Sequence, residues 1–201
     1  MFTVKVTGIE ALRRNLARLP ADIEAKVVQP ALNRTAEKAR AEINRAIPQE
    51  YAVKASEVRN AVEIRRARTG DLRAVLSVFG SARKRGRSMN LIHFLASVAG
   101  TKTRGSRAKK AELKALGRQL GFHIRRDAGL KSIAGAFVGN KGRTIFRRTG
   151  DARFPIEPVQ VIGYSQMFGS QKISKRVLDK IRGDLPIEID RALSRVLKGA
   201  S

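Results

Sequence analysis

After a short strand-like stretch at the start of the chain, the spacing of the apolar residues is helical, then strand-like, then helical again, and this order limits the fold more than any other feature. From about residue 22 to residue 47, apolar side chains recur three or four positions apart, which predicts one long amphipathic helix. Pro30 lacks an amide proton and should kink or restart this helix, and Pro48 should end it. Helical spacing returns over residues 173–197, where residues 183–186 should divide two shorter helices.

Between these helical regions, apolar residues alternate with polar ones or form short runs, as they do in β-strands. Two pairs of runs flank the glycine-containing turns Thr69-Gly70-Asp71 and Gly139-Asn140-Lys141-Gly142, and each pair predicts a β-hairpin. Residues 91–96 fit either a strand or a short buried helix. Further strands are expected at residues 2–7 and 159–162.

The order of strand, helices, strands and helices predicts an α+β fold. We expect a mostly antiparallel sheet with the long helix of the N-terminal half and the C-terminal helices packed on one face, and basic loop insertions. The 201 residues are enough to bury a core, and we expect a single domain over residues 1–201. An insertion at about residues 80–130, rich in Gly, Ser, Lys and Arg, is expected to be mobile.

The chain is strongly basic, with 42 Lys and Arg residues against 17 Asp and Glu residues and a formal net charge of +25 at pH 7. Most of the excess lies between residues 83 and 153, which contain 19 basic residues and three acidic ones. A chain this basic repels itself unless an acidic surface or a nucleic acid surrounds it. The uneven distribution therefore predicts a localised contact with a polyanion.

Three basic runs are the strongest chemical feature of the sequence. Contact of such loops with phosphates would give salt-dependent binding that is independent of base sequence. Aromatic residues are sparse among the runs, so stacking on single strands is not indicated. The runs fit a nucleic acid and an acidic protein equally well. The candidate polyanion-binding residues are Arg83, Lys84, Arg85, Arg87, Lys102, Arg104, Arg107, Lys109, Lys110, Arg143, Arg147 and Arg148.

Residues for catalysis or metal binding are few. The chain has no cysteine and two histidines, His93 and His123, each flanked by apolar residues that favour a packing role. The nearest approach to a carboxylate cluster is Asp184, Glu188 and Asp190, and acids in the first turn of a helix are favoured by the helix dipole. The sequence therefore predicts no enzymatic activity, no metal and no cofactor.

No segment of the sequence predicts insertion into a membrane. The first eight residues lack the apolar core of a signal peptide. The longest mostly apolar stretch, residues 91–100, is shorter than the about 20 residues that a transmembrane helix needs. We therefore expect an intracellular protein without a membrane partner.

Three stretches carry a resemblance to a known family: Val6 to Leu12, Ala31 to Arg40, and Phe154-Pro155-Ile156-Glu157 followed by Ile162-Gly163-Tyr164-Ser165. Together they resemble the prophage minor tail protein Z family, the tail completion proteins of long-tailed phages. The resemblance spans roughly residues 3–197 and is weakest at about residues 80–130. The Gly163-Tyr164-Ser165 sequence departs from the Gly-Pro-Ser expected at this position.

The resemblance implies a single tail-completion-like domain and a structural, non-enzymatic virion protein that completes the head-proximal end of the tail. Such proteins help the tail join the filled head and are implicated in holding the genome end. The implied partners are other copies in a homo-oligomeric ring, the tail terminator, tail tube or head–tail connector proteins, and the phage DNA end. Assembly would take place in the host cytoplasm. The alternative is a cellular protein that binds nucleic acid independently of sequence.

Overall fold

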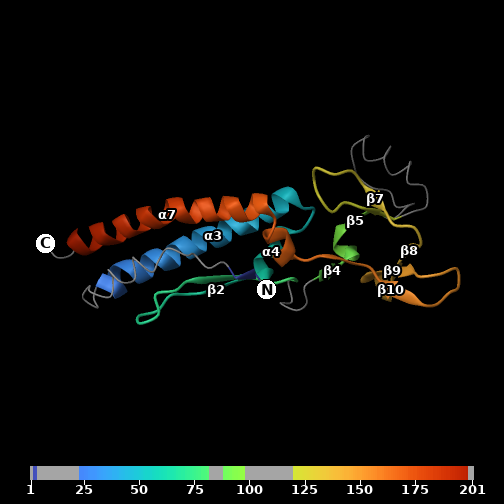
Figure 1. Ribbon diagram of the computed structural model, residues 1–201, viewed down its shortest axis with the longest axis horizontal. Helices are drawn as coiled ribbons and strands as arrows, with labels where there is room; N and C mark the ends of the chain where they lie inside the picture. The colour runs from blue at the N-terminus through green and yellow to red at the C-terminus, as the bar shows by residue number, and fades with distance from the viewer. Residues whose placement is uncertain (1, 4–22, 82–87, 98–119, 199–201) are drawn as a thin grey trace.

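The computed structural model describes residues 2–3, 23–81, 88–97 and 120–198. The molecule is elongated, with a pair of long helices at one end and a group of small sheets at the other (Figure 1). Of the strand predicted at residues 2–7, the structure describes the two-residue strand β1 (Phe2–Thr3), and residues 4–7 lie outside the described residues.

The long helix of the N-terminal half begins with a π-helical turn, η1 (Glu24–Val28), and continues directly as α3 (Gln29–Glu50). Pro30 lies in the first turn of α3, directly after the change from π-helix to α-helix. The backbone stays helical at Val28 and Gln29, so the helix continues through this point without the expected restart. The prediction that Pro48 ends the helix is wrong, because α3 continues to Glu50. Pro48 lies in the last turn, so it removes one hydrogen bond of the helix, and the carbonyl of Pro48 accepts a hydrogen bond from Arg126 at 2.6 Å.

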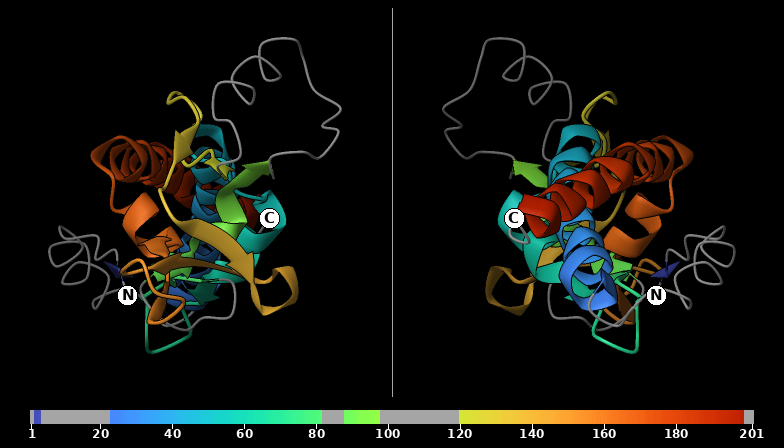
Figure 2. Two further views of the ribbon diagram at one scale, coloured as in Figure 1. Left: turned by 90° about the vertical axis from the view of Figure 1, so that its right-hand side faces the viewer. Right: turned by 90° about the vertical axis from the view of Figure 1, so that its left-hand side faces the viewer.

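The second long helix, α7 (Gln171–Lys198), runs antiparallel to α3 and lies beside it along most of its length (Figures 1 and 2). The expected break at residues 183–186 is therefore wrong. Pro186 and Arg182 are exposed, so the carbonyl that Pro186 leaves unpaired can bond to water. Buried contacts of Asp184 and Glu188 with α3 hold this stretch in the helix.

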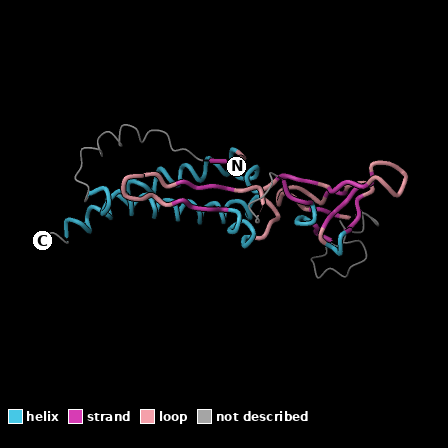
Figure 3. Tube along the Cα trace, turned by 90° about the horizontal axis from the view of Figure 1, so that it is seen from below, coloured by secondary structure: helices cyan, strands magenta, loops and turns pink. Residues whose placement is uncertain are grey.

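A three-stranded antiparallel sheet lies along the helix pair (Figure 3). The short helix α4 (Ala55–Ala61) leads into β2 (Val62–Arg65), which pairs with β3 (Val75–Val78), and β1 completes the order β1-β3-β2. The register pairs Val62 with Val78 and Arg65 with Val75, which confirms the first predicted hairpin.

The remaining strands form three small antiparallel sheets, which together we name the β lobe (residues 88–97 and 120–162). The α+β class is confirmed, with several short sheets instead of one continuous sheet. Residues 91–96 form a 3₁₀ turn followed by the start of a strand, so they combine the two expected alternatives. The elements are β4 (Ser88–Asn90), η2 (Leu91–Phe94), β5 (Leu95–Ser97), β6 (Gly121–Phe122), β7 (Lys131–Ser132), β8 (Ala136–Gly139), η3 (Asn140–Gly142), β9 (Thr144–Arg148), β10 (Ile156–Pro158) and β11 (Gln160–Ile162).

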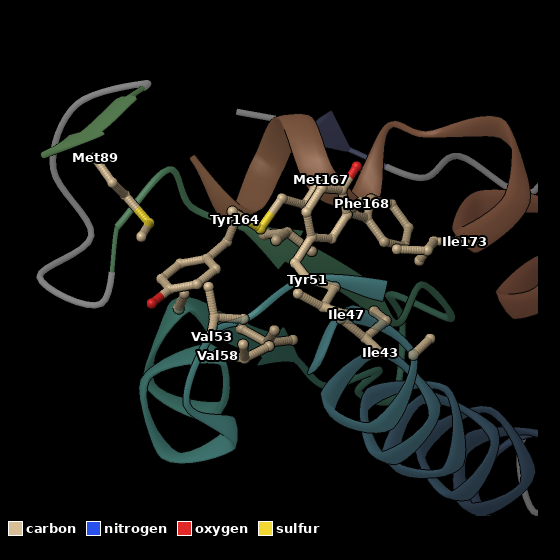
Figure 4. Packing of buried hydrophobic residues seen from close by; sticks show 14 of the residues in the cluster. Ile43, Ile47, Tyr51, Val53, Val58, Met89, Tyr164, Met167, Phe168 and Ile173 are labelled. Carbon is tan, nitrogen blue, oxygen red and sulfur yellow. The ribbon is translucent and has the colours of Figure 1, made fainter. Parts of the chain in front are cut away.

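The hydrophobic core lies where the C-terminal half of α3 meets α6 (Tyr164–Phe168), β3 and the β lobe (Figure 4). Ile43, Ile47 and Met167 are completely buried, and residues of the β lobe such as Phe122 and Ile145 belong to the same cluster. This continuous packing joins the helix pair to the β lobe.

The C-terminal half of α7 leaves part of its apolar surface uncovered. The sequence pattern places Ile189, Leu193, Val196 and Leu197 on one apolar face. Ala192 is buried, whereas Leu193 and Leu197 are 38% and 68% exposed. The predicted amphipathic helix exists, but the described residues do not cover this face.

Candidate nucleic-acid interface

The three-stranded sheet β8-β9-β10 carries the three candidate residues that the structure describes, Arg143, Arg147 and Arg148. All three side chains are exposed. The other nine candidates lie outside the described residues: Arg83, Lys84, Arg85, Arg87, Lys102, Arg104, Arg107, Lys109 and Lys110.

The hairpin between β8 and β9 is as the sequence predicts. Val138 pairs with Ile145 and Phe137 pairs with Phe146, and the turn has Asn140, Lys141 and Gly142 at positive φ. Glycine is required at position 139, since a Cβ there would lie 2.7 Å from the Phe146 ring. The small residue lets the aromatic ring lie against the backbone.

Asn90 fixes β9 in the β lobe. Its side-chain oxygen accepts a hydrogen bond from the Ile145 N–H at 2.8 Å, and its amide group lies 3.3 and 3.2 Å from the carbonyls of Ile145 and Val159. Ile145 itself is completely buried. The strand that carries Arg147 and Arg148 is therefore anchored near its start.

The three arginines do not form one cluster. Side chains alternate along a strand, so Arg147 extends from the same face of β9 as buried Ile145, and Arg148 shares the other face with Phe146. Arg143 precedes the strand and so lies at the other end of β9 from Arg148. A polyanion that lies on one face of the hairpin would therefore contact one of Arg147 and Arg148 more closely than the other.

Arg148 lies among aromatic side chains. The Phe137 and Phe146 rings stack at 6.0 Å between centroids, and the Arg148 guanidinium lies 5.2 Å from the centre of Phe137. Arg148 also donates a hydrogen bond to the carbonyl of Arg153 at 3.1 Å. This arginine therefore links the hairpin to the loop between β9 and β10.

That loop presents Phe154, whose surface is 64% exposed. The Arg153 guanidinium lies 5.8 Å from the centre of the Phe154 ring. At the base of the loop, the Thr149 hydroxyl and N–H both donate to the carbonyl of Pro155, at 3.2 and 3.3 Å. The loop is closed by these bonds and holds an aromatic ring and cations at the surface.

Aromatic residues are sparse along the basic runs, but the fold brings several of them together in this part of the molecule. Strand pairing and the loop bring Phe137, Phe146 and Phe154 near Arg148 and Arg153, although they come from separate segments. Two sequence signals point to this arrangement: the adjacent pair Arg153-Phe154, and the hairpin register around residues 139–142.

The β lobe has few acids to neutralise these arginines. Residues 120–163 contain eight Lys and Arg residues and three acids. Within this stretch Arg125 pairs with Asp127 at 3.2 Å, whereas no described carboxylate forms an ion pair with Arg147, Arg148 or Arg153. Exposed, unpaired cations beside aromatic rings are a suitable surface for phosphates and bases.

The carboxylates of α7 form a different kind of site. Lys38 of α3 lies 2.7 Å from Glu188 and 3.4 Å from Asp184, and Arg191 contacts Glu188 at 2.8 Å. Glu188 is 1% exposed. The interpretation as first-turn acids is wrong, because α7 is unbroken and both carboxylates lie in its interior, paired with cations. Among the described residues, no group of three His, Cys, Asp or Glu side chains could hold a metal ion.

Glu42 completes this ionic layer between α3 and α7. It is 6% exposed and contacts Arg176 of α7 at 2.5 Å and Arg45 at 3.4 Å. The layer holds the two helices in one register, because a shifted helix would leave buried carboxylates without cations.

The ionic layer should make stability depend on acid pH. The hydrogen bond from Lys38 lowers the pKa of Glu188, so the unfolded chain binds more protons at acid pH. The stabilisation is complete above the ordinary carboxyl pKa of about 4.3 and is lost as the pH falls through the lower folded-state pKa. We expect Glu188→Gln to lower Tm at about pH 7 and to differ much less from the unchanged protein at about pH 2.5. Thermal melting over pH checks this, with the exposed Asp190→Asn as control; an equal difference at both pH values would contradict it.

The expected packing role of His93 is wrong. Its side chain is 41% exposed, and Nδ1 lies 3.2 Å from the Glu57 carboxylate. The same carboxylate accepts a hydrogen bond from the Tyr164 hydroxyl at 2.8 Å. Burial, together with this hydrogen bond, raises the pKa of Tyr164 far above its ordinary value. These contacts join α4, η2 and α6 beside the core.

A comparison with known protein families identifies the family of this chain. The model of a family described as prophage minor tail protein Z matches residues 6–200 of the 201. The chain belongs to the prophage minor tail protein Z family. It is accordingly a structural component of a phage tail. Neither a curated protein nor a solved structure matches the chain.

The segments that resemble the minor tail protein Z family have distinct positions in the fold. Residues 31–40 lie in α3, and residues 154–157 run from the exposed loop into β10. Gly163-Tyr164-Ser165 begins α6, where Tyr164 is buried and bonded to Glu57. Residues 6–12 lie outside the described part of the chain. In the same described part, no helix combines the length and apolar composition needed to span a membrane.

Proposed function

We propose that this minor tail protein completes the head-proximal end of the tail, helps the tail join the filled head and contacts the genome end, without enzymatic activity. The observation that carries the proposal is the family match over residues 6–200. The exposed arginines and aromatic rings of the β lobe support contact with DNA at this position. Membership in a phage tail family also favours this role over that of a cellular nucleic-acid-binding protein.

The proposed partners are further copies of the chain in a closed ring, the tail terminator, tail tube or connector proteins, and the DNA end. Exposed Leu193 and Leu197 on α7 support a contact with another protein chain. The net charge of +25 opposes close approach of identical copies unless DNA or acidic neighbours offset it. Ring closure would therefore depend on the assembling tail. The candidates outside the described residues, such as Arg83 and Lys84, belong to the proposed DNA contact on sequence grounds.

Deletion of the gene from the prophage tests this role. After induction, we expect filled heads and separate tails of normal length, with few joined particles in electron micrographs and a low infectious titre. Expression of the unchanged chain from a plasmid should restore joining. Normal yields of joined, infectious particles without the protein would contradict the proposal, as would the loss of tail tubes altogether.

A further inference from the structure

Phe154 is an isolated exposed aromatic ring in a basic surface. The other large apolar side chains that the described residues expose, Ile187, Leu193 and Leu197, all lie on α7. The helix pair and the β lobe occupy opposite ends of the molecule (Figure 1). A protein-docking surface would need further exposed apolar groups beside the ring, and the loop around Phe154 instead offers cations.

The loop holds this ring ready for a ligand. Its base is closed by the two bonds from Thr149 to the Pro155 carbonyl, and Arg148 bonds to the carbonyl of Arg153. The Arg153 guanidinium approaches the ring at 5.8 Å, yet 64% of the Phe154 surface remains exposed. A phenylalanine side chain has two rotatable bonds, so it loses little conformational entropy when a second flat group stacks on it.

The neighbouring arginines supply the charge that such a flat group would need. A guanidinium has five N–H donors, so Arg148 keeps donors for a phosphate besides the one bonded to the Arg153 carbonyl. No described carboxylate pairs with Arg148 or Arg153. The surface therefore combines an aromatic face with unneutralised cations, which is the combination that binds unpaired nucleotides.

We propose that Phe154 stacks on an unpaired base of a nucleic acid while Arg148 and Arg153 contact the adjacent phosphates. The inference rests on the proposed contact with the genome end and specifies its form. A continuous duplex hides the faces of its bases in the stack, so an aromatic ring reaches a base face only at a duplex end or on a single strand. Phosphate contacts alone would not distinguish these forms from a continuous duplex.

A single-tryptophan variant tests the stacking directly, because the chain contains no tryptophan. In Phe154→Trp, the indole should lose most of its fluorescence when an oligo-dT strand of about 16 nucleotides binds. Relaxed circular duplex DNA, which has no ends, should bind with little change in fluorescence. The matched control is Leu197→Trp, at a position that is 68% exposed on α7, and its emission should change little with either DNA.

The affinity of Phe154 variants provides the second readout. Phe154→Ala should weaken oligo-dT binding about 5- to 150-fold and leave circular-duplex binding unchanged, and Phe154→Trp should retain oligo-dT affinity. Tight oligo-dT binding without quenching at position 154, or equal quenching at 154 and 197, would overturn the inference. Intact oligo-dT binding by Phe154→Ala would also overturn the inference, and a failure of that variant in head–tail joining would then show that the ring contacts a protein. Failure to bind either DNA would overturn the proposed genome-end contact as well. A failure of the stacking inference alone is therefore distinguishable from a failure of the proposed function.

Discussion

Replacing Ile43 with alanine should destabilise the protein by about 2–5 kcal/mol. Ile43 is completely buried in α3, in the part of the core where the helix meets α6 and the β lobe. Removing its outer methyl and methylene groups loses burial of apolar surface and leaves a cavity that a close-packed core fills poorly. For a chain of this length, each kcal/mol corresponds to about 2–4 °C in Tm.

Ile187→Ala is the matched control for this substitution. Ile187 lies on α7 and is 47% exposed, so the same change in side chain removes little buried surface. We expect a change within about 0.5 kcal/mol. Thermal or urea unfolding of both variants measures the difference, and equal stabilities would show that Ile43 does not face the core.

Replacing Arg143, Arg147 and Arg148 together with alanine should reduce the salt dependence of binding to duplex DNA. Each phosphate contact contributes about −0.9 to the slope of log affinity against log salt concentration, so the slope should become shallower by up to about 2.7. The loss should be similar for DNA of any sequence, because phosphate contacts carry no base information. Fluorescence anisotropy over a series of salt concentrations measures it.

The control for the triple variant replaces Lys54, Lys175 and Lys198, which are exposed and lie outside the β lobe. It removes the same charge, so an equal change in slope would show that net charge alone governs binding. The single variants separate the two faces of β9, since Arg147 and Arg148 extend to opposite sides. The proposal places Arg148 on a phosphate beside the base that stacks on Phe154. Arg148→Ala should therefore reduce the salt-dependence slope of oligo-dT binding more than Arg147→Ala does.

Much of the fold could be predicted from hydrophobic periodicity. Helical spacing identified α3 and α7, and the turns around Gly70 and residues 139–142 identified both hairpins. The ends of the helices were less predictable, because a proline in a helix costs less where the freed carbonyl reaches water or another donor. Pro186 lies on an exposed turn of α7, and Pro48 lies in the last turn of α3. The small separate sheets depend on long-range pairing that local patterns do not encode.

The site could be predicted only in part. Charge located a basic segment, and Arg143, Arg147 and Arg148 are indeed exposed in it. Sequence spacing did not reveal that Arg148 contacts Phe137 across the hairpin or that Arg153 lies over Phe154. The buried pairs of Glu188 and Asp184 with Lys38 were also missed, because the partners are far apart in sequence and meet only when α3 and α7 pack.

Cryo-electron microscopy of purified tails with and without this protein tests the central proposal most directly. If the protein completes the head-proximal end, the difference density should form a closed ring at the end of the tail that binds the head, with the β lobe next to the DNA path. Difference density at the opposite tip or along the tube, or no protein in the purified tails, would contradict the proposal.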